Sequence, residues 1–234
     1  TDQIPTLQQS HEDFQIQPYL GTYFYVFNTT KEPVNDPKVR KALTLAIDRQ
    51  AIVDVVTKGG QKPASGFVPS GMTLSDGSDF REKGGDYGIP ATANVEEAKK
   101  LLAEAGYPDG QGFPTIEVMY NTLEAHKAIA EAIQEMWKQN LGINVELRNE
   151  EWKVFQETRT QGDFIIARHG WIGDYVDPMT FLDMWLSNSG NNDADWFNDE
   201  YDKLIADSKK AEGADRDALM LQAEKLMMDA NITM

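Results

Sequence analysis

The sequence predicts an α/β fold in which a sheet is flanked by helices. Short β-prone segments alternate with segments that carry apolar residues at helical spacing, most clearly after residue 114. Strands that alternate with helices form sheets that are largely parallel, and we expect such a sheet here. The chain has 234 residues, of which 41% are hydrophobic. That is enough for one large domain or two small ones, and residues 1–234 are predicted to form a single domain.

The N-terminal part of this pattern begins with an aromatic strand. Residues 19–28 (YLGTYFYVFN) are rich in β-prone side chains and predict a strand. Asp36 followed by Pro37 predicts a helix start, because the carboxylate caps the free N–H groups and proline suits the first helical position. The apolar residues that follow have the i, i+3, i+4 spacing of one buried helical face: Val39, Ala42, Leu43, Ala46 and Ile47.

A second short helix and a long loop follow. Asp48 can cap a helix that ends at Gly59–Gly60. Residues 59–93 are dense in glycine and proline and predict a long irregular loop, a kind of segment that is often functional. Asn94 then begins a helix that ends at Gly106.

The alternation of strands and helices is regular in the rest of the chain. Strands are predicted over residues 115–121, 143–149 and 163–171, and helices over 124–140, 151–160, 177–185, 199–211 and 215–230. Ligands of such sheets bind beyond the carboxyl ends of strands. We therefore expect the ligand surface where strands 19–28 and 163–171 end.

Charge and cysteine content exclude several classes of function. The net charge is −16 and no basic cluster is present, which argues against nucleic acid and anionic membranes as partners. The absence of cysteine excludes disulfides, thiolate zinc sites and cysteine nucleophiles. No apolar run is long enough to span a bilayer, and residues 1–10 do not resemble a signal peptide. Both chain ends look like cuts, so we expect a fragment of a longer protein.

Motifs for catalysis and metal binding are missing or weak. The sequence contains no phosphate-binding glycine motif and no serine-hydrolase elbow. SNSGNNDADWFNDE (187–200) offers oxygen ligands for calcium, but it lacks the order of a calcium loop and also fits a solvated loop. Asp174 and Asp177 could form a glycosidase acid pair, although Asp177 before Pro178 is better explained as a helix cap. We expect no catalytic residue, no metal and no cofactor.

Binding is the class of function that the segment HGWIGDYVDP (169–178) favours. Asp174 offers a carboxylate for a cation, whereas Arg168 and His126 offer donors for an anion. Trp152 and Trp171 offer flat apolar walls, or are core residues, since tryptophan is highly buried on average. A zwitterion with variable side chains, in other words a peptide, fits these groups.

Long ordered motifs add a resemblance to a known family. The run N-D-x-x-V-R-K-A-L-x-x-A-I-D-R at residues 35–49, VEEAKKLLAEAGYP (95–108) and the stretch from Tyr120 to Pro178 resemble the oligopeptide/dipeptide/nickel group of extracellular solute-binding proteins, and most closely its oligopeptide-binding branch. The resemblance extends over nearly the whole chain. It implies one lobe of a periplasmic-binding-protein-like clamshell, with a mixed sheet flanked by helices.

The resemblance also implies partners and residue roles. The receptor would be monomeric and extracytoplasmic, periplasmic or lipid-anchored, and would deliver oligopeptides to the membrane permease of an ABC importer. Asp174 would bind the peptide's α-ammonium, with Trp171 and Tyr175 beside it. Arg168 and His126 resemble groups that meet peptide carboxylates, and Trp152 resembles a pocket wall. A receptor for nickel or another small solute, or a carbohydrate-active enzyme that uses Asp174 as an acid, stays as the alternative.

Overall fold

The computed structural model describes residues 3–17 and 19–234 and contains a mixed four-stranded sheet. Its strands are β1 (Gly21–Phe27), β2 (Ile116–Asn121), β3 (Val145–Glu150) and β4 (Ile166–Ile172), in the spatial order β1-β4-β2-β3. β2 is parallel to both β3 and β4, whereas β1 is antiparallel to β4. The α/β fold with a mixed sheet is confirmed. The predicted domain of residues 1–234 also includes residues 1, 2 and 18, which lie outside the described residues.

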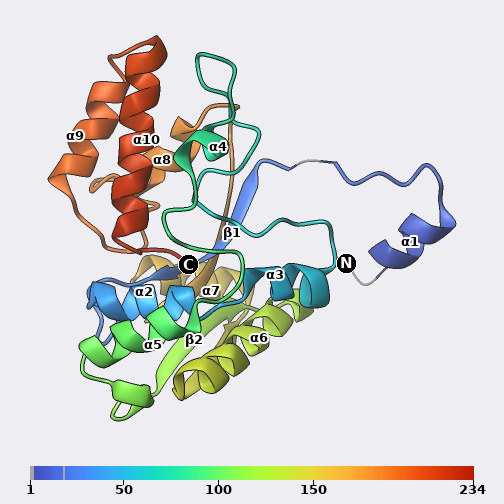
Figure 1. The fold of residues 1–234 in the computed structure, drawn as a ribbon, viewed down its shortest axis with the longest axis vertical. Coiled ribbons are helices and arrows are strands. Elements are labelled where there is room, and N and C mark those ends of the chain that lie inside the picture. Colours follow the sequence, from blue (N-terminus) through green and yellow to red (C-terminus); the bar gives the residue numbers. More distant parts are fainter. Residues whose placement is uncertain (1–2, 18) are drawn as a thin grey trace.

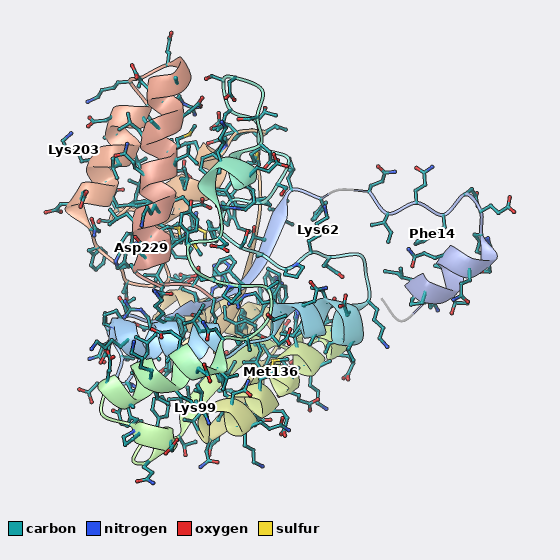
Figure 2. All side chains as sticks on the ribbon, in the orientation of Figure 1. Phe14, Lys62, Lys99, Met136, Lys203 and Asp229 are labelled. Atoms are coloured by element: carbon teal, nitrogen blue, oxygen red, sulfur yellow. The ribbon has the colours of Figure 1, made fainter. Side chains whose placement is uncertain are left out.

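Helices cover both faces of the sheet (Figure 1). Their bounds are α1 (Ile4–Ser10), α2 (Pro37–Leu45), α3 (Arg49–Ala51), the π-helix η1 (Ile52–Thr57), α4 (Phe80–Gly84), α5 (Val95–Glu104), the 3₁₀-helix η2 (Pro108–Gly110), α6 (Glu124–Leu141), α7 (Trp152–Thr160), α8 (Met179–Leu182), the 3₁₀-helix η3 (Asp183–Trp185), α9 (Asp199–Ser208) and α10 (Gly213–Asp229). α1 and the following segment around Phe14 extend away from the sheet (Figures 1 and 2). α1 was not predicted from the sequence.

The alternation of side chains along β1 divides them between two cores. Tyr25 and Phe27 join a core with residues of α2, α5 and α6. Phe24 and Val26 point to the opposite face and join a core with residues of α7, η3 and α10. Burying a large apolar side chain stabilises the fold by about 1.5–3 kcal/mol relative to leaving it in water. Both faces of the sheet therefore contribute to stability.

Short polar side chains begin the helices where the sequence predicts them. The carboxylates of Asp36 and Asp48 accept hydrogen bonds of 2.8 Å from the backbone N–H groups of Lys38 and Ala51. The Asn94 side chain caps α5 in the same way, at 3.3 Å from the Glu97 nitrogen. These caps are confirmed.

The direction of β1 corrects the predicted position of the ligand surface. Gly21 pairs with Ile172 and Phe27 pairs with Ile166, so the first residue of β1 lies beside the last residue of β4. The strands 19–28 and 163–171 therefore end on opposite sides of the sheet and cannot form one ligand surface there, although the other two strand pairings are parallel as expected. The pattern of apolar residues does not encode strand direction, and for this reason the prediction was wrong.

The segment predicted as an irregular loop, residues 59–93, contains α4 and is tied to α10 by a buried ion pair. The Glu224 side chain is fully buried and accepts hydrogen bonds from Arg81 Nη1 at 2.6 Å, Arg81 Nη2 at 2.9 Å and the Val68 N–H at 2.8 Å. The Tyr87 hydroxyl donates to the same carboxylate. This network joins residues more than 130 positions apart, which no local pattern could indicate.

The C-terminal residues extend the sheet beyond β1. The N–H of Tyr25 donates to the Met234 carbonyl and the N–H of Met234 donates to the Tyr25 carbonyl, both at 3.0 Å. Phe27 N–H donates to the Ile232 carbonyl at 3.0 Å. The outer edge of β1 is thereby paired. No helix within residues 3–17 and 19–234 combines the length and the apolar character needed to cross a membrane.

Candidate functional site

Asp174 lies in a turn that follows β4, at residues 173–178, which we call the site turn. The backbone holds its first half in place: Gly173 N–H donates to the Leu20 carbonyl at 2.9 Å, and Asp174 N–H donates to Thr180 Oγ1 at 3.0 Å. A Cβ at Gly173 would lie 3.2 Å from side-chain atoms of both Phe181 and Thr180, which are buried. Glycine thus lets the turn approach the core closely. Asp174 itself is exposed.

An ion pair from α10 holds the second half of the site turn. Arg216 Nη1 donates to Asp177 Oδ2 at 2.9 Å, and Arg216 Nη2 donates to Asp177 Oδ1 at 2.8 Å. The Met179 N–H also donates to Asp177 Oδ1, at 2.9 Å, so Asp177 contributes to the start of α8 as predicted. Burial alone would raise the pKa of Asp177, but these hydrogen bonds outweigh it and lower that pKa. Asp177 is therefore a paired carboxylate with a structural role.

Acidic groups gather around the site turn. Burial, and then the charges of Asp183, Asp177 and Asp174, raise the pKa of the Tyr175 hydroxyl. Burial also raises the pKa of Asp183, and the charge of Asp174 adds to this shift. Among the described residues, Arg216 is the one cationic side chain that forms an ion pair with the site turn. The surface that carries Asp174 is negative and suits a cationic group.

Arg168 and His126 meet on the sheet face that packs against α6. The Arg168 guanidinium lies over the Tyr23 ring, 4.8 Å from its centroid, and Arg168 Nη1 donates to Asn121 Oδ1 at 3.3 Å. The Tyr23 hydroxyl is 3.1 Å from Nδ1 of His126, which is buried at the start of α6. Burial and the nearby Arg168 charge lower the pKa of His126 to about 4. At neutral pH the cluster of Arg168, His126, Tyr23 and Asn121 therefore holds one positive charge, on Arg168.

Two polar atoms of this region lack a hydrogen-bond partner among the described residues. They are the Tyr25 hydroxyl and Arg168 Nε, both buried. Burial raises the pKa of the Tyr25 hydroxyl well above its ordinary value, with a further contribution from Tyr23. Buried donors without partners are costly, and an anion bound by the cluster is a natural partner for such groups.

The tryptophans differ in exposure. Trp152 begins α7 with 47% of its surface exposed and stacks on Phe155 at a centroid distance of 6.2 Å, so it is not a core residue. Trp171 is half-buried, and its indole N–H donates to the Thr180 carbonyl at 2.7 Å. Trp171 thus packs beneath the site turn. Arg168 and Trp171 point to opposite faces of β4, because side chains alternate along a strand.

His169 has a structural role although it lies between predicted site residues. Its ring is buried, stacks on Phe24 at 4.8 Å and lies 3.2 Å from Asp193 Oδ2. Arg159 donates to the same carboxylate oxygen at 2.7 Å. Burial lowers the pKa of His169. These contacts join β4 to the loop 187–198.

The loop considered for calcium uses several of its side chains within the protein. Asn198 caps α9 at 2.9 Å from the Tyr201 nitrogen, Asn192 Nδ2 donates to the Trp196 carbonyl at 2.7 Å, and Asp193 is engaged as above. Within the part of the chain that the structure describes, no three residues among His, Cys, Asp and Glu form a group that could hold a metal ion.

The structure divides the predicted site residues into two groups, with Trp152 apart from both. Asp174, Tyr175 and Trp171 lie at the end of β4, whereas Arg168 and His126 form the cluster beside α6. Trp152 follows β3, on the side of the sheet where the carboxyl ends of the parallel strands β2, β3 and β4 lie. Sequence reasoning missed Tyr23, Asn121 and Arg216. The alternating aromatic residues of β1 could have indicated Tyr23, but nothing local indicates Arg216.

Known proteins resemble this chain over almost its whole length. It is 44% identical over 214 residues to the periplasmic oligopeptide-binding protein OppA of Salmonella typhimurium, a match that covers 91% of this chain and 38% of that protein. It is 40% identical over 232 residues to the oligopeptide-binding protein OppA of Bacillus subtilis, covering 98% of this chain and 42% of that protein. The chain spans about two fifths of the length of these curated relatives.

Solved structures and a family model agree with these relatives. The crystal structure of Haemophilus influenzae OppA in complex with RPPGFSPFR superposes with a TM-score of 0.85 at 36% identity, covering 99% of this chain and 45% of that one. Residues 1–193 match the family model of the bacterial extracellular solute-binding proteins, family 5 Middle. The resemblance inferred from the sequence motifs is confirmed. The chain belongs to family 5 of the bacterial extracellular solute-binding proteins.

Proposed function

We propose that this chain is the peptide-binding lobe of a two-lobed extracytoplasmic receptor that delivers oligopeptides to an ABC importer. The observation that carries the proposal is the separation of an exposed carboxylate, Asp174, from the cationic cluster around Arg168. A peptide has an ammonium group at one end and a carboxylate at the other. The oligopeptide-binding relatives support the same conclusion.

Asp174 is the group that we assign to the peptide ammonium. It is exposed and has no ion-pair partner among the described residues, whereas the neighbouring Asp177 is already paired with Arg216. A carboxylate that faces an ammonium in a closed and dry cleft forms a strong charge-assisted hydrogen bond. Tyr175 and Trp171 would pack beside the first residues of the peptide.

The cluster around Arg168 is the group that we assign to peptide carboxylates. Arg168 supplies the charge, and His126 and Tyr23 supply polar atoms beside it. Arg168 and Asp174 are six positions apart, so their backbone atoms are at most about 20 Å from each other. An extended peptide of up to about six residues stays within that length, which suits a site that fixes both ends.

Trp152 is assigned to a side-chain pocket wall, since a large indole surface is exposed near the same edge of the sheet. Bridging waters can replace direct contacts to peptide side chains at little cost, so such pockets tolerate many sequences. The receptor is proposed to act as a monomer, periplasmic or lipid-anchored, without a cofactor and without catalysis, in partnership with the importer's membrane permease.

The test is calorimetry on the full-length receptor that contains this chain, with Asp174→Asn and wild type each titrated with a free-amine peptide and its N-acetylated form. Loss of the charge that answers the ammonium should weaken binding of the free-amine peptide by about 2–4 kcal/mol. The acetylated peptide should bind weakly to both proteins. Glu146→Gln is the matched control, because it removes one exposed carboxylate from β3, far from the site turn in the sheet.

Other outcomes separate the alternatives. Equal losses for the free and acetylated peptides would mean that Asp174 is structural. Binding of Ni²⁺ or another small solute without binding of peptides would favour a different receptor of the same group. Glycoside hydrolysis that Asp174→Asn abolishes would favour the enzyme.

A further inference from the structure

The site turn has two differently built halves. Gly173 and Asp174 are held in place by their backbone N–H groups, which donate to the Leu20 carbonyl and to Thr180 Oγ1. Tyr175 and Val176 are exposed, with 49% and 69% of their surfaces in solvent. The turn then returns to the protein at Asp177, whose carboxylate is the only part of the second half bound to a distant element among the described contacts.

That distant element is α10, through Arg216. The guanidinium binds both oxygens of Asp177 at 2.8 and 2.9 Å, a bidentate geometry that fixes orientation as well as distance. The two side chains are 28% and 30% exposed, so the pair is partly shielded from water. A lysine could supply the charge but not the two parallel hydrogen bonds.

The positive charge of Arg216, taken by itself, would repel an ammonium ligand. Asp174, Asp177 and Asp183 make this surface negative, and Arg216 reduces that potential. If Arg216 acted only through its charge, its removal would strengthen the attraction of an ammonium group. If it acted by holding the turn, its removal would weaken binding. The two roles therefore predict changes of opposite sign.

We infer that Arg216 is a positioning residue for Asp174: its bidentate pair with Asp177 holds the site turn in the geometry that receives a peptide ammonium. This inference rests on the proposed function. Arg216 makes no contact with the ligand in this role. It acts through Asp177, three residues from Asp174 along the turn.

The test uses the full-length receptor with Arg216→Gln, Arg216→Lys, Asp174→Asn and the double variant Arg216→Gln/Asp177→Asn. Each is titrated with the free-amine peptide and its acetylated form. Arg216→Gln should weaken binding of the free-amine peptide about five- to tenfold, the scale of coupling between groups that share one hydrogen-bonded network, and leave the acetylated peptide unchanged. Arg216→Lys should recover part of the loss. The double variant should lose no more than Arg216→Gln, because one interaction is removed in both.

Lys225→Gln is the matched control. It removes one positive charge from the same helix, where Lys225 forms an exposed pair with Asp229, which is labelled in Figure 2. It should leave both affinities unchanged. Thermal unfolding of each variant reports whether the variant folds. If Arg216→Gln does not fold, the affinities of Arg216→Lys are compared with those of the wild type instead.

Four results would overturn the inference. Tighter binding of the free-amine peptide by Arg216→Gln would show that Arg216 acts through its charge. Unchanged binding would show that Arg216 has no effect on this ligand. Equal weakening for both peptides would give it a general structural role. If Asp174→Asn has no effect, the ammonium role of Asp174 fails and the inference fails with it. A loss in Asp174→Asn with none in Arg216→Gln overturns only the positioning role.

Discussion

His126 should make the stability of this chain depend on pH in a measurable way. The side chain is 8% exposed, the Tyr23 hydroxyl is 3.1 Å from its Nδ1, and the Arg168 charge is close. Burial and Arg168 lower its pKa to about 4, against about 6.5 in an unfolded chain. The folded protein therefore holds His126 neutral at pH values where the unfolded chain binds a proton.

The sign of the effect follows from this difference in proton binding. Between about pH 6.5 and about pH 4 the unfolded state binds more protons, so the free energy of unfolding falls as the pH falls. Above about pH 6.5 His126 is neutral in both states, so its protonation does not reduce the free energy of unfolding. Below that pH the unfolded state takes up the proton and stability is lost progressively. The lowering of the His126 pKa from about 6.5 to about 4 corresponds to about 3 kcal/mol of unfolding free energy in total.

The assay is urea unfolding of this 234-residue chain, followed by tryptophan fluorescence, in steps from about pH 7.5 to about pH 5. The lowered pKa of His169 adds to the slope of the wild type. The contribution of His126 is thus the difference between the wild type and His126→Gln. At neutral pH the variant should be less stable by about 1 kcal/mol, because the hydrogen bond with Tyr23 is altered. Its stability should then fall less steeply with acid.

His11 supplies the control, since it is exposed in the segment after α1. His11→Gln should leave the curve of the wild type unchanged. Parallel curves for the wild type and His126→Gln would refute the reasoning, because they would mean that the proton affinity of His126 is the same in both states. Direct NMR titration of the ring would then show a pKa near 6.5.

Three further predictions concern other parts of the chain. Glu224→Ala should lower the free energy of unfolding by about 3–5 kcal/mol, because it leaves the buried Arg81 charge without a partner, whereas Lys225→Gln should change it by less than about 1 kcal/mol in the same urea assay. Trp152→Ala should cost less than about 1.5 kcal/mol of stability, given its exposure, yet change peptide preference in a competition assay; a large loss of stability with unchanged preference would make it a packing residue. The chain by itself should bind peptides weakly, because an ion pair of Asp174 in water is worth only about 0–1 kcal/mol, and calorimetry that finds tight binding would contradict this.

Local patterns of the sequence were sufficient for most helices and strands. Asp36, Asp48 and Asn94 begin helices as predicted, because a cap depends on atoms within three residues of one another. The strand ending in HGWI was also recognised from its own composition. The relation between strands was not, and β1 proved antiparallel to β4. Strand direction is decided by crossover connections and packing, which are properties of the whole chain.

The sequence alone determined the family, the order of the strands and most helices, and the residues Asp174, Arg168 and His126 as candidates for ligand binding. Only the tertiary structure decided that Arg168 and His126 share one sheet face with Tyr23, that Trp171 lies on the other, and that Arg216 holds the site turn. The reason is physical. Caps and periodicity arise from interactions between near neighbours in the chain, whereas Tyr23 and His126 are 103 residues apart and meet only when the register of β1 and β4 places them together.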